Sequence, residues 1–272
     1  MEKKLQEIAS HFALEGGIAA IDSLGEGFIN DTFIIRTEGE APDYILQRKN
    51  KNIFPDVPAM MDNIRHRFVQ WDEALKRDTA GRKKELSEEI GWIESRRGEM
   101  LGFWSKVEEG TIPTRVTHND TKINNILFDR QGEVLCAIDL DTVMASTSLN
   151  DFGDAIRSYA NTGDEDDRDL SRVGLSLEMF RAYTEGYLSQ RAKQLTDSEI
   201  DHLAFSARYI TFEQVLRFLM DYIDGDTYYK VKYPGHNLVR THAQYRLLQS
   251  MEEHYGEMCR IVRETVDKYR KA

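Results

Sequence analysis

A short stretch in the middle of the chain carries the residue types that phosphoryl transfer requires. His118, Asp120, Lys122 and Asn125 lie close together in the sequence, and Asp139 follows a little later. Transfer of a phosphoryl group needs a carboxylate that accepts the proton of the attacking hydroxyl, oxygen ligands for Mg²⁺, and a cation that offsets the charge of the moving group. We interpret Asp120 as that carboxylate, Asn125 and Asp139 as the metal ligands, and Lys122 as the cation.

The sequence around this stretch predicts a hairpin that would bring the two metal ligands together. Apolar runs at residues 126–128 and 134–138 flank a glycine-containing turn, which is typical of two antiparallel strands. Asn125 would precede the first strand and Asp139 would end the second, so both would lie at the same end of the hairpin. Any one acidic residue here could be a solvated turn residue, but the joint pattern favours a catalytic site.

The rest of the sequence predicts an α+β fold. A short amphipathic helix would be followed by a small antiparallel sheet, and most of the chain after Pro58 has the three- and four-residue apolar spacing of helices. A cleft between two such parts is a natural ligand site. We expect strands at residues 17–24, 28–37, 44–48 and 115–117, and helices at 2–13, 59–64, 68–75, 86–104, 166–188, 197–222 and 237–270.

The charge and cysteine content exclude several classes of protein. With 36 Lys and Arg against 47 Asp and Glu, the 272-residue chain has a net charge of −11. It therefore lacks the basic field that would attract nucleic acid or an anionic membrane. Cys136 and Cys259 lie far apart and outside zinc-binding spacing, and no run reaches the roughly 18 apolar residues of a membrane span. We expect a cytoplasmic protein that handles phosphate groups locally, through a metal or a few placed cations.

The catalytic stretch resembles that of the aminoglycoside phosphotransferase and choline kinase family, the small-molecule relatives of protein kinases, which share an H-x-D-x-x-x-x-N loop and a later metal-binding aspartate. Within that group, residues 116–128, 137–144 and 151–157 resemble the N-acetylhexosamine 1-kinases, and the likeness extends through residues 212–217 and 221–229. The resemblance implies a protein-kinase-like fold with two lobes. It also implies that ATP, with Mg²⁺, phosphorylates the anomeric hydroxyl of a small-molecule sugar, GlcNAc or GalNAc.

The resemblance supports the roles given above to the catalytic base and the Mg²⁺ ligands, and it implies further roles. Asp141 would be either another metal contact or an acceptor for a sugar hydroxyl. Arg217 and Tyr228 could reach sugar hydroxyls or the N-acetyl group, although a surface or packing role fits them equally well. Three residues would hold the catalytic loop through hydrogen bonds: His118, Asp151 and Asp154.

The nucleotide would be bound by the N-terminal sheet. Gly25, Gly27 and Asn30 lie between two predicted strands, where the family places the loop that covers the phosphates, and glycine lets backbone amides approach phosphate oxygens. The third strand should carry a lysine for the phosphates. This chain has Gln47 in that place, and we take the next residue, Arg48, as the cation; only one of the two can point into the cleft, because side chains alternate along a strand.

We expect an N-lobe over residues 1–64 and a helical C-lobe over residues 65–272. In the family, the rest of the N-lobe sheet and the adenine-binding hinge lie between the segments that meet here after residue 64. Either that segment is a natural deletion or residues of the natural protein are absent from this chain. We favour the second interpretation, because both flanks keep the family pattern and three strands would form a poor wall for adenine.

Two alternatives to a sugar kinase stay open. The protein could phosphorylate another hydroxylated small molecule, such as an aminoglycoside or choline, or it could be a nucleotide-binding pseudokinase. The retention of all the catalytic-loop residues and of the later aspartate argues against the pseudokinase. The acidic run at residues 164–169 could be mistaken for a metal cluster, but we interpret it as the solvated first turn of a helix.

Overall fold

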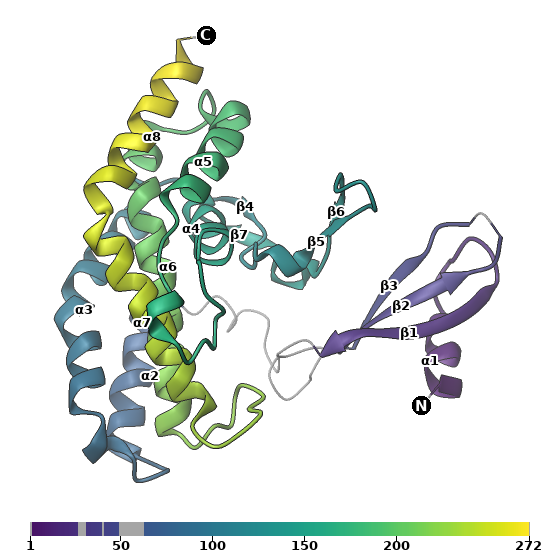
Figure 1. The fold of residues 1–272 in the computed structure, drawn as a ribbon, viewed down its shortest axis with the longest axis horizontal. Coiled ribbons are helices and arrows are strands. Elements are labelled where there is room, and N and C mark those ends of the chain that lie inside the picture. The colour runs from purple at the N-terminus through teal and green to yellow at the C-terminus, as the bar shows by residue number, and fades with distance from the viewer. Residues whose placement is uncertain (1, 27–30, 40, 49–62, 272) are drawn as a thin grey trace. The chain divides into compact units, whose positions relative to one another are not determined.

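The computed structural model describes residues 2–26, 31–39, 41–48 and 63–271, and the chain divides into two compact units. One unit comprises Met1–Met61 with Tyr228–Lys230, and the other comprises Asp62–Thr227 with Val231–Ala272. Figure 1 follows the chain through both units by colour. The lobe boundary predicted after residue 64 stays a prediction.

The first unit contains a short helix and a three-stranded antiparallel sheet. In β2, Phe33 and Ile35 are buried while Arg36 is exposed. The two buried residues form a small apolar core with Ala9 and Leu46. The small sheet that the sequence predicts is confirmed, but the helix expected over residues 2–13 ends four residues early, where the chain turns. The elements are α1 (Glu2–Ala9), β1 (Ile18–Glu26), β2 (Asp31–Thr37) and β3 (Tyr44–Arg48), with the strands ordered β1-β2-β3.

The second unit is mainly helical and contains two small two-stranded sheets. Every helix among the described residues is too short or too polar to cross a lipid bilayer. The α-helices of the second unit are α2 (Ile64–Arg77), α3 (Ser87–Glu108), α4 (Ser148–Tyr159), α5 (Leu177–Arg191), α6 (Asp197–Ile223), α7 (His236–Glu253) and α8 (Tyr255–Arg270). Its strands are β4 (Arg115–Thr117), β5 (Ile126–Phe128), β6 (Val134–Ala137) and β7 (Met144–Ser146), and its single-turn 3-10 helices are η2 (Lys83–Glu85), η3 (Ile123–Asn125), η4 (Leu140–Thr142) and η5 (Leu170–Arg172).

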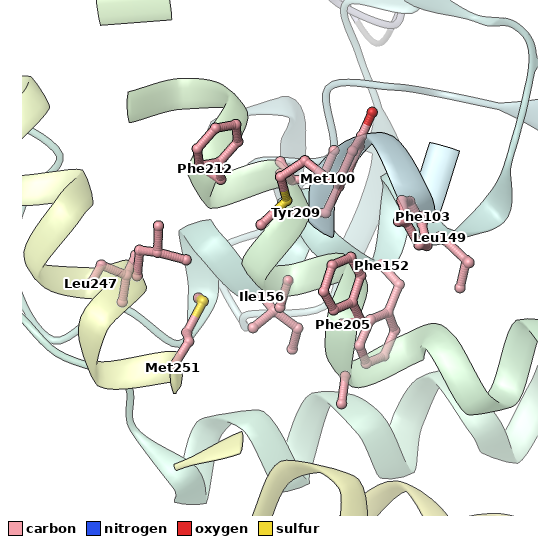
Figure 2. Close-up of a cluster of buried hydrophobic side chains, with 14 of the residues drawn as sticks. Met100, Phe103, Leu149, Phe152, Ile156, Phe205, Tyr209, Phe212, Leu247 and Met251 are labelled. Atoms are coloured by element: carbon pink, nitrogen blue, oxygen red, sulfur yellow. The ribbon is translucent and has the colours of Figure 1, made fainter. Parts of the chain in front are cut away.

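Helix α6 is the centre of the second unit. It packs against α7, α4, α8, α2 and α3, and Phe212, Leu216 and Leu219 along it are fully buried. Figure 2 shows part of this core, in which Tyr209 and Phe212 of α6 lie among apolar side chains of the neighbouring helices. Helix α6 is buried on most sides, so its apolar residues are spread around the helix instead of forming a single stripe, and polar residues such as Arg208 and Asp221 are buried with them.

Close packing between α4 and α6 fixes the helix that supports the candidate site. A Cβ atom added to Gly153 of α4 would lie 2.4 Å from the backbone oxygen of Ser206 in α6. Only glycine permits that approach, because no side chain can shift to relieve a clash with backbone. The middle of α4 is therefore held at a defined position on α6.

Several predicted helices differ from the structure. The helix expected over residues 166–188 begins only at Leu177, after an N-cap at Ser176, so the acidic run at 164–169 is not a helical first turn. Three of its side chains are paired instead: Glu165 with Arg157, Asp166 with His236, and Asp167 with Arg172. The helix expected over residues 237–270 is broken at His254. Strand β7 has no counterpart among the predicted elements, and most of the helix predicted at 59–64 lies outside the described residues.

Candidate active site

The predicted catalytic loop is held at both ends by regular structure. It follows β4, which pairs antiparallel with β7, and it leads through η3 into the hairpin of β5 and β6. Asn119 within the loop has φ 62°, a left-handed conformation that asparagine tolerates better than most residues. Its side chain explains why the conformation is kept, since Nδ2 donates to the backbone oxygen of Thr142 at 3.0 Å.

Asp151, in the first turns of α4, fixes the backbone of this loop. Its Oδ2 accepts from the N–H of His118 at 3.0 Å, and its Oδ1 accepts from the N–H of Asn119 at 2.7 Å. Burial raises the pKa of Asp151, and the two amide hydrogen bonds oppose that rise. The Thr121 hydroxyl also donates to the backbone oxygen of Asp151 at 2.6 Å. The expectation that Asp151 holds the loop agrees with these bonds, but the structure pairs Asp154 with Arg157 at 2.9 Å instead.

The carboxylate of Asp120 is oriented by two donors from its own loop. Its Oδ2 accepts from Nζ of Lys122 at 2.7 Å and from Nδ2 of Asn125 at 2.8 Å. The same Nδ2 donates to the backbone oxygen of Asp120 at 2.8 Å. Three of the predicted site residues therefore lie in direct contact. The Asp120 side chain keeps 24% of its surface exposed, so a reactant can reach it.

The hairpin brings Asn125 and Asp139 to one end, as the sequence predicts. Ile126 pairs with Ala137, and the N–H of Ile138 donates to the backbone oxygen of Asn125 at 2.9 Å. His118 of the loop also contacts this end of the hairpin, because its Nε2 lies 2.9 Å from the backbone oxygen of Ile138. A carbonyl oxygen can only accept, so Nε2 carries the hydrogen.

Asp139 lies where a bound cation would stabilise its ionised carboxylate. Burial, together with the neighbouring Asp141 carboxyl, raises the pKa of Asp139 to about 7. Its buried Oδ1 has no hydrogen-bond partner, and both hydrogen bonds of the Asn125 side chain use its nitrogen, which leaves the carbonyl oxygen for a ligand. Oxygen donors of this kind fit Mg²⁺, which takes few ligands from protein and completes its shell with phosphate and water. Among the described residues, no group of three or more His, Cys, Asp or Glu side chains is arranged to hold a metal ion.

The remaining predicted site residues are dispersed along the chain. Among the nucleotide contacts, Gly27 and Asn30 lie outside the described residues. Gly25 falls in β1, and Arg48 ends β3 with its backbone paired to Asp31, but the structure does not describe the side chain of Arg48. These four assignments stay predictions.

The three predicted substrate contacts fall in three different elements. Asp141 lies in η4, next to the hairpin, and Arg217 lies in α6. Tyr228 belongs to the connection between α6 and α7 and groups with the first unit, whereas Asp120 belongs to the second. The ring of Tyr228 packs edge-on against Tyr229, with the centroids 4.8 Å apart. Their contact with a substrate stays a prediction.

Sequence reasoning missed one residue that is central to this region. Glu199 of α6 is fully buried and accepts hydrogen bonds from Arg115 and Ser148. The only local signal is its capping box with Thr196. That pattern predicts the start of a helix, but it does not reveal the partners, which lie far away in sequence.

The chain combines a small antiparallel sheet, a mainly helical remainder, and a predicted catalytic loop followed by the hairpin that carries the predicted metal ligands, which are the parts of a protein-kinase-like fold. Residues 56–188 match the model of the phosphotransferase enzyme family. The match spans the catalytic loop, the hairpin and α4 with Asp151. The predicted α+β fold is thereby confirmed, as is the coarser level of the predicted activity, that of a phosphotransferase.

A comparison with solved structures gives a more distant likeness. The crystal structure of a candidate aminoglycoside phosphotransferase from Ralstonia eutropha JMP134 is 13% identical to this chain in sequence. The likeness covers 98% of each chain, with a TM-score of 0.48.

Proposed function

We propose that the protein is an ATP- and Mg²⁺-dependent kinase for a small molecule, and that its acceptor is the anomeric hydroxyl of an N-acetylhexosamine. The observation that carries the proposal is the orientation of Asp120 by Lys122 and Asn125 through a single carboxylate oxygen. The phosphotransferase match supports the reaction class. The choice of sugar rests on the resemblance of the catalytic stretch and of residues 212–229 to N-acetylhexosamine 1-kinases.

In the proposed reaction, Asp120 accepts the proton of the acceptor hydroxyl. The hydroxyl oxygen then forms its bond to the γ-phosphorus of ATP, and the bond from that phosphorus to the bridging oxygen of ADP breaks. Because Oδ2 of Asp120 already accepts two hydrogen bonds, we assign Oδ1 to receive the proton. Asp151 holds the backbone on which Asp120 is carried, so the carboxylate meets the acceptor already oriented.

Positive charge must offset the charge on the transferring group. Lys122, 2.7 Å from Asp120, supplies a fixed cation beside the reacting centre. Asn125 and Asp139 would hold Mg²⁺, which when bound would neutralise phosphate charge in the transition state. The raised pKa of Asp139 fits this role, because a buried carboxylate with an unpaired oxygen gains most from a bound cation.

The test is a panel of acceptors incubated with ATP and Mg²⁺ and followed by phosphorus NMR. The panel holds GlcNAc, GalNAc, glucose, an aminoglycoside and choline, and Asp120→Asn protein prepared in the same way reports any contaminating kinase. We expect a phosphate signal coupled to the anomeric proton with GlcNAc or GalNAc, and none from the variant.

Other outcomes would revise or overturn the proposal. A product with the aminoglycoside or choline but not with the sugars would keep the kinase and replace its acceptor. If the native protein binds ATP but neither phosphorylates any acceptor of the panel nor hydrolyses ATP, it is a nucleotide-binding pseudokinase and the proposal is wrong.

A further inference from the structure

One buried carboxylate joins the two elements that hold the candidate catalytic loop. Glu199, the third residue of α6, has no exposed surface. Its Oε1 accepts from Nε of Arg115 at 2.6 Å and from the hydroxyl of Ser148 at 2.8 Å. Its Oε2 accepts from Nη2 of Arg115 at 2.7 Å and from the backbone N–H of Thr196 at 2.8 Å. Both oxygens are thus fully used, and neither is left to bind a ligand.

The two long-range partners lie on opposite sides of the loop. Arg115 is the first residue of β4, the strand that runs into His118. Ser148 is the first residue of α4, one turn before Asp151 on the same helix, and Asp151 accepts from the amides of His118 and Asn119. Glu199 therefore closes a ring of contacts that runs through β4, the loop, Asp151 and α4 and returns to α6.

The strength of these bonds keeps the ring closed over a wide pH range. Burial opposes ionisation of Glu199, but the hydrogen bonds from Arg115, Thr196 and Ser148 outweigh it and lower the pKa of Glu199 to about 2. The paired Arg115 and Glu199 side chains meet in a bidentate arrangement, which fixes direction as well as distance. Loss of one partner would leave a buried charge unpaired, a costly change in the interior.

We propose that Glu199 is a positioning residue for phosphoryl transfer, which sets the separation of β4 and α4 and through them the aim of Asp120. Glu199 touches none of the residues assigned to base, cation or metal, so it acts only through the elements that it joins. The inference rests on the proposed function, because the reaction that it serves is the transfer assigned to Asp120. The inference adds to that function a residue of α6 that affects the position of Asp120, although it lies far from the loop in the sequence.

The first test replaces Glu199 by glutamine, which keeps the volume but turns one acceptor into a donor facing Arg115 or Ser148. We expect kcat to fall about 10- to 100-fold, because small displacements of a catalytic group have effects of that size. The KM values for ATP and acceptor should change less than about 2-fold, since the substrate contacts are untouched. All rates are measured at a temperature where circular dichroism shows the variant to be folded.

A matched control separates positioning from general loss of stability. Glu252 of α7 accepts a similar two-bond fork from Arg96 of α3, with both distances 2.7 Å, and neither residue contacts the loop or its supports among the described interactions. Glu252→Gln should also lower the stability of the protein but leave kcat within about 2-fold of the native value. If both variants lose the same share of kcat, Glu199 is merely structural and the inference is overturned.

Two further variants keep the test decisive. Ser148→Ala removes the bond between Glu199 and α4, together with a contact to Tyr187 of α5, but leaves the Arg115 fork in place. It should therefore fold more readily than Glu199→Gln and lower kcat about 3-fold or more. Arg115→Gln combined with Glu199→Gln restores a neutral pair that can exchange hydrogen bonds, and it should recover part of the kcat lost in Glu199→Gln. If Ser148→Ala has native kcat, or if the double variant recovers nothing, Glu199 does not position the loop.

A second readout does not depend on activity. The backbone amides of His118 and Asn119 donate to a carboxylate and should give displaced proton resonances in ¹⁵N-labelled native protein. Glu199→Gln should shift both resonances, whereas Glu252→Gln should leave them in place. Shifts in a protein that phosphorylates nothing would support the positioning role while the proposed function fails. Unchanged resonances in an active kinase would overturn the positioning role alone.

Discussion

The ammonium group of Lys122 donates a 2.7 Å hydrogen bond to Oδ2 of Asp120. The bond places a positive charge beside the carboxylate that we assign as the base, and Asn125 donates to the same oxygen. The two donors fix the direction of the carboxylate and leave its second oxygen for the acceptor. A single lysine can thus both orient the base and offset charge on the phosphoryl group.

Replacing Lys122 should therefore affect the chemical step more than binding. For Lys122→Met we expect kcat to fall at least about 10-fold, because a fixed cation near developing charge is lost. Lys122→Arg keeps the charge and should retain part of the activity. Lys193→Met, an exposed lysine on the short connection after α5, is the matched control and should behave as native protein. Steady-state kinetics with native rates for Lys122→Met would contradict this role.

Asp120→Asn should abolish proton acceptance and keep the shape of the site. We expect turnover to fall about 10²- to 10⁴-fold, the range attributed to general-base catalysis. ATP binding, measured by calorimetry, should change little, because no predicted nucleotide contact is altered. Asp201→Asn removes an exposed carboxylate on α6 and serves as the control. Turnover by Asp120→Asn equal to that of the control would show that Asp120 is not the base.

The pKa of Asp139 gives the metal-free protein a characteristic pH dependence. Since that pKa is raised from 3.8 to about 7, the folded state keeps a proton that the unfolded state has lost. The resulting stability is fully present below about pH 4 and is lost as the pH rises toward about 7. In EDTA, the free energy of unfolding of native protein, relative to Asp139→Asn, should fall over that range and then level off. A constant difference between the two proteins in urea denaturation would contradict the burial of this carboxyl.

Glu199 should show the opposite dependence. Its pKa is lowered from 4.5 to about 2, so the folded state favours the ionised form, and this stability is present above about pH 4.5 and lost as the pH falls toward about 2. A shift of this size corresponds to about 3 kcal/mol at neutral pH. The difference in free energy of unfolding between native protein and Glu199→Gln should be flat from pH 7 to 5.5 and shrink by about 1 kcal/mol at pH 3.5. Denaturation curves with no such decrease would mean that Glu199 is not held ionised.

The features that could be predicted from the sequence are those set by near neighbours. The hairpin that joins Asn125 to Asp139 depends on two apolar runs and a turn, all within a few residues, and the structure has it. The contact of Asp120 with Lys122 and Asn125 likewise lies within one loop. Side-chain alternation and helical spacing act over similar distances, which is why the small sheet and most helices were also predictable.

The supports of the site depend on pairings between distant parts of the chain. The acidic run at 164–169 resembles a helix start in sequence, yet its carboxylates pair with Arg157, His236 and Arg172. The partners of Glu199 lie 84 and 51 residues away. No local pattern selects one arginine among many as the partner of a buried carboxylate. That choice is made when α4, α6 and β4 pack together, since packing alone decides which charges are buried side by side.

The sequence by itself therefore determined the contacts within the predicted catalytic loop, the hairpin that joins Asn125 to Asp139, and the match to phosphotransferases. The tertiary structure decided that Asp151 fixes the loop backbone and that Glu199 ties β4 to α4. The physical reason is the range of the interactions involved. Backbone hydrogen bonding within a hairpin is specified by adjacent residues, whereas a buried ion pair exists only after helices distant in sequence have closed around it.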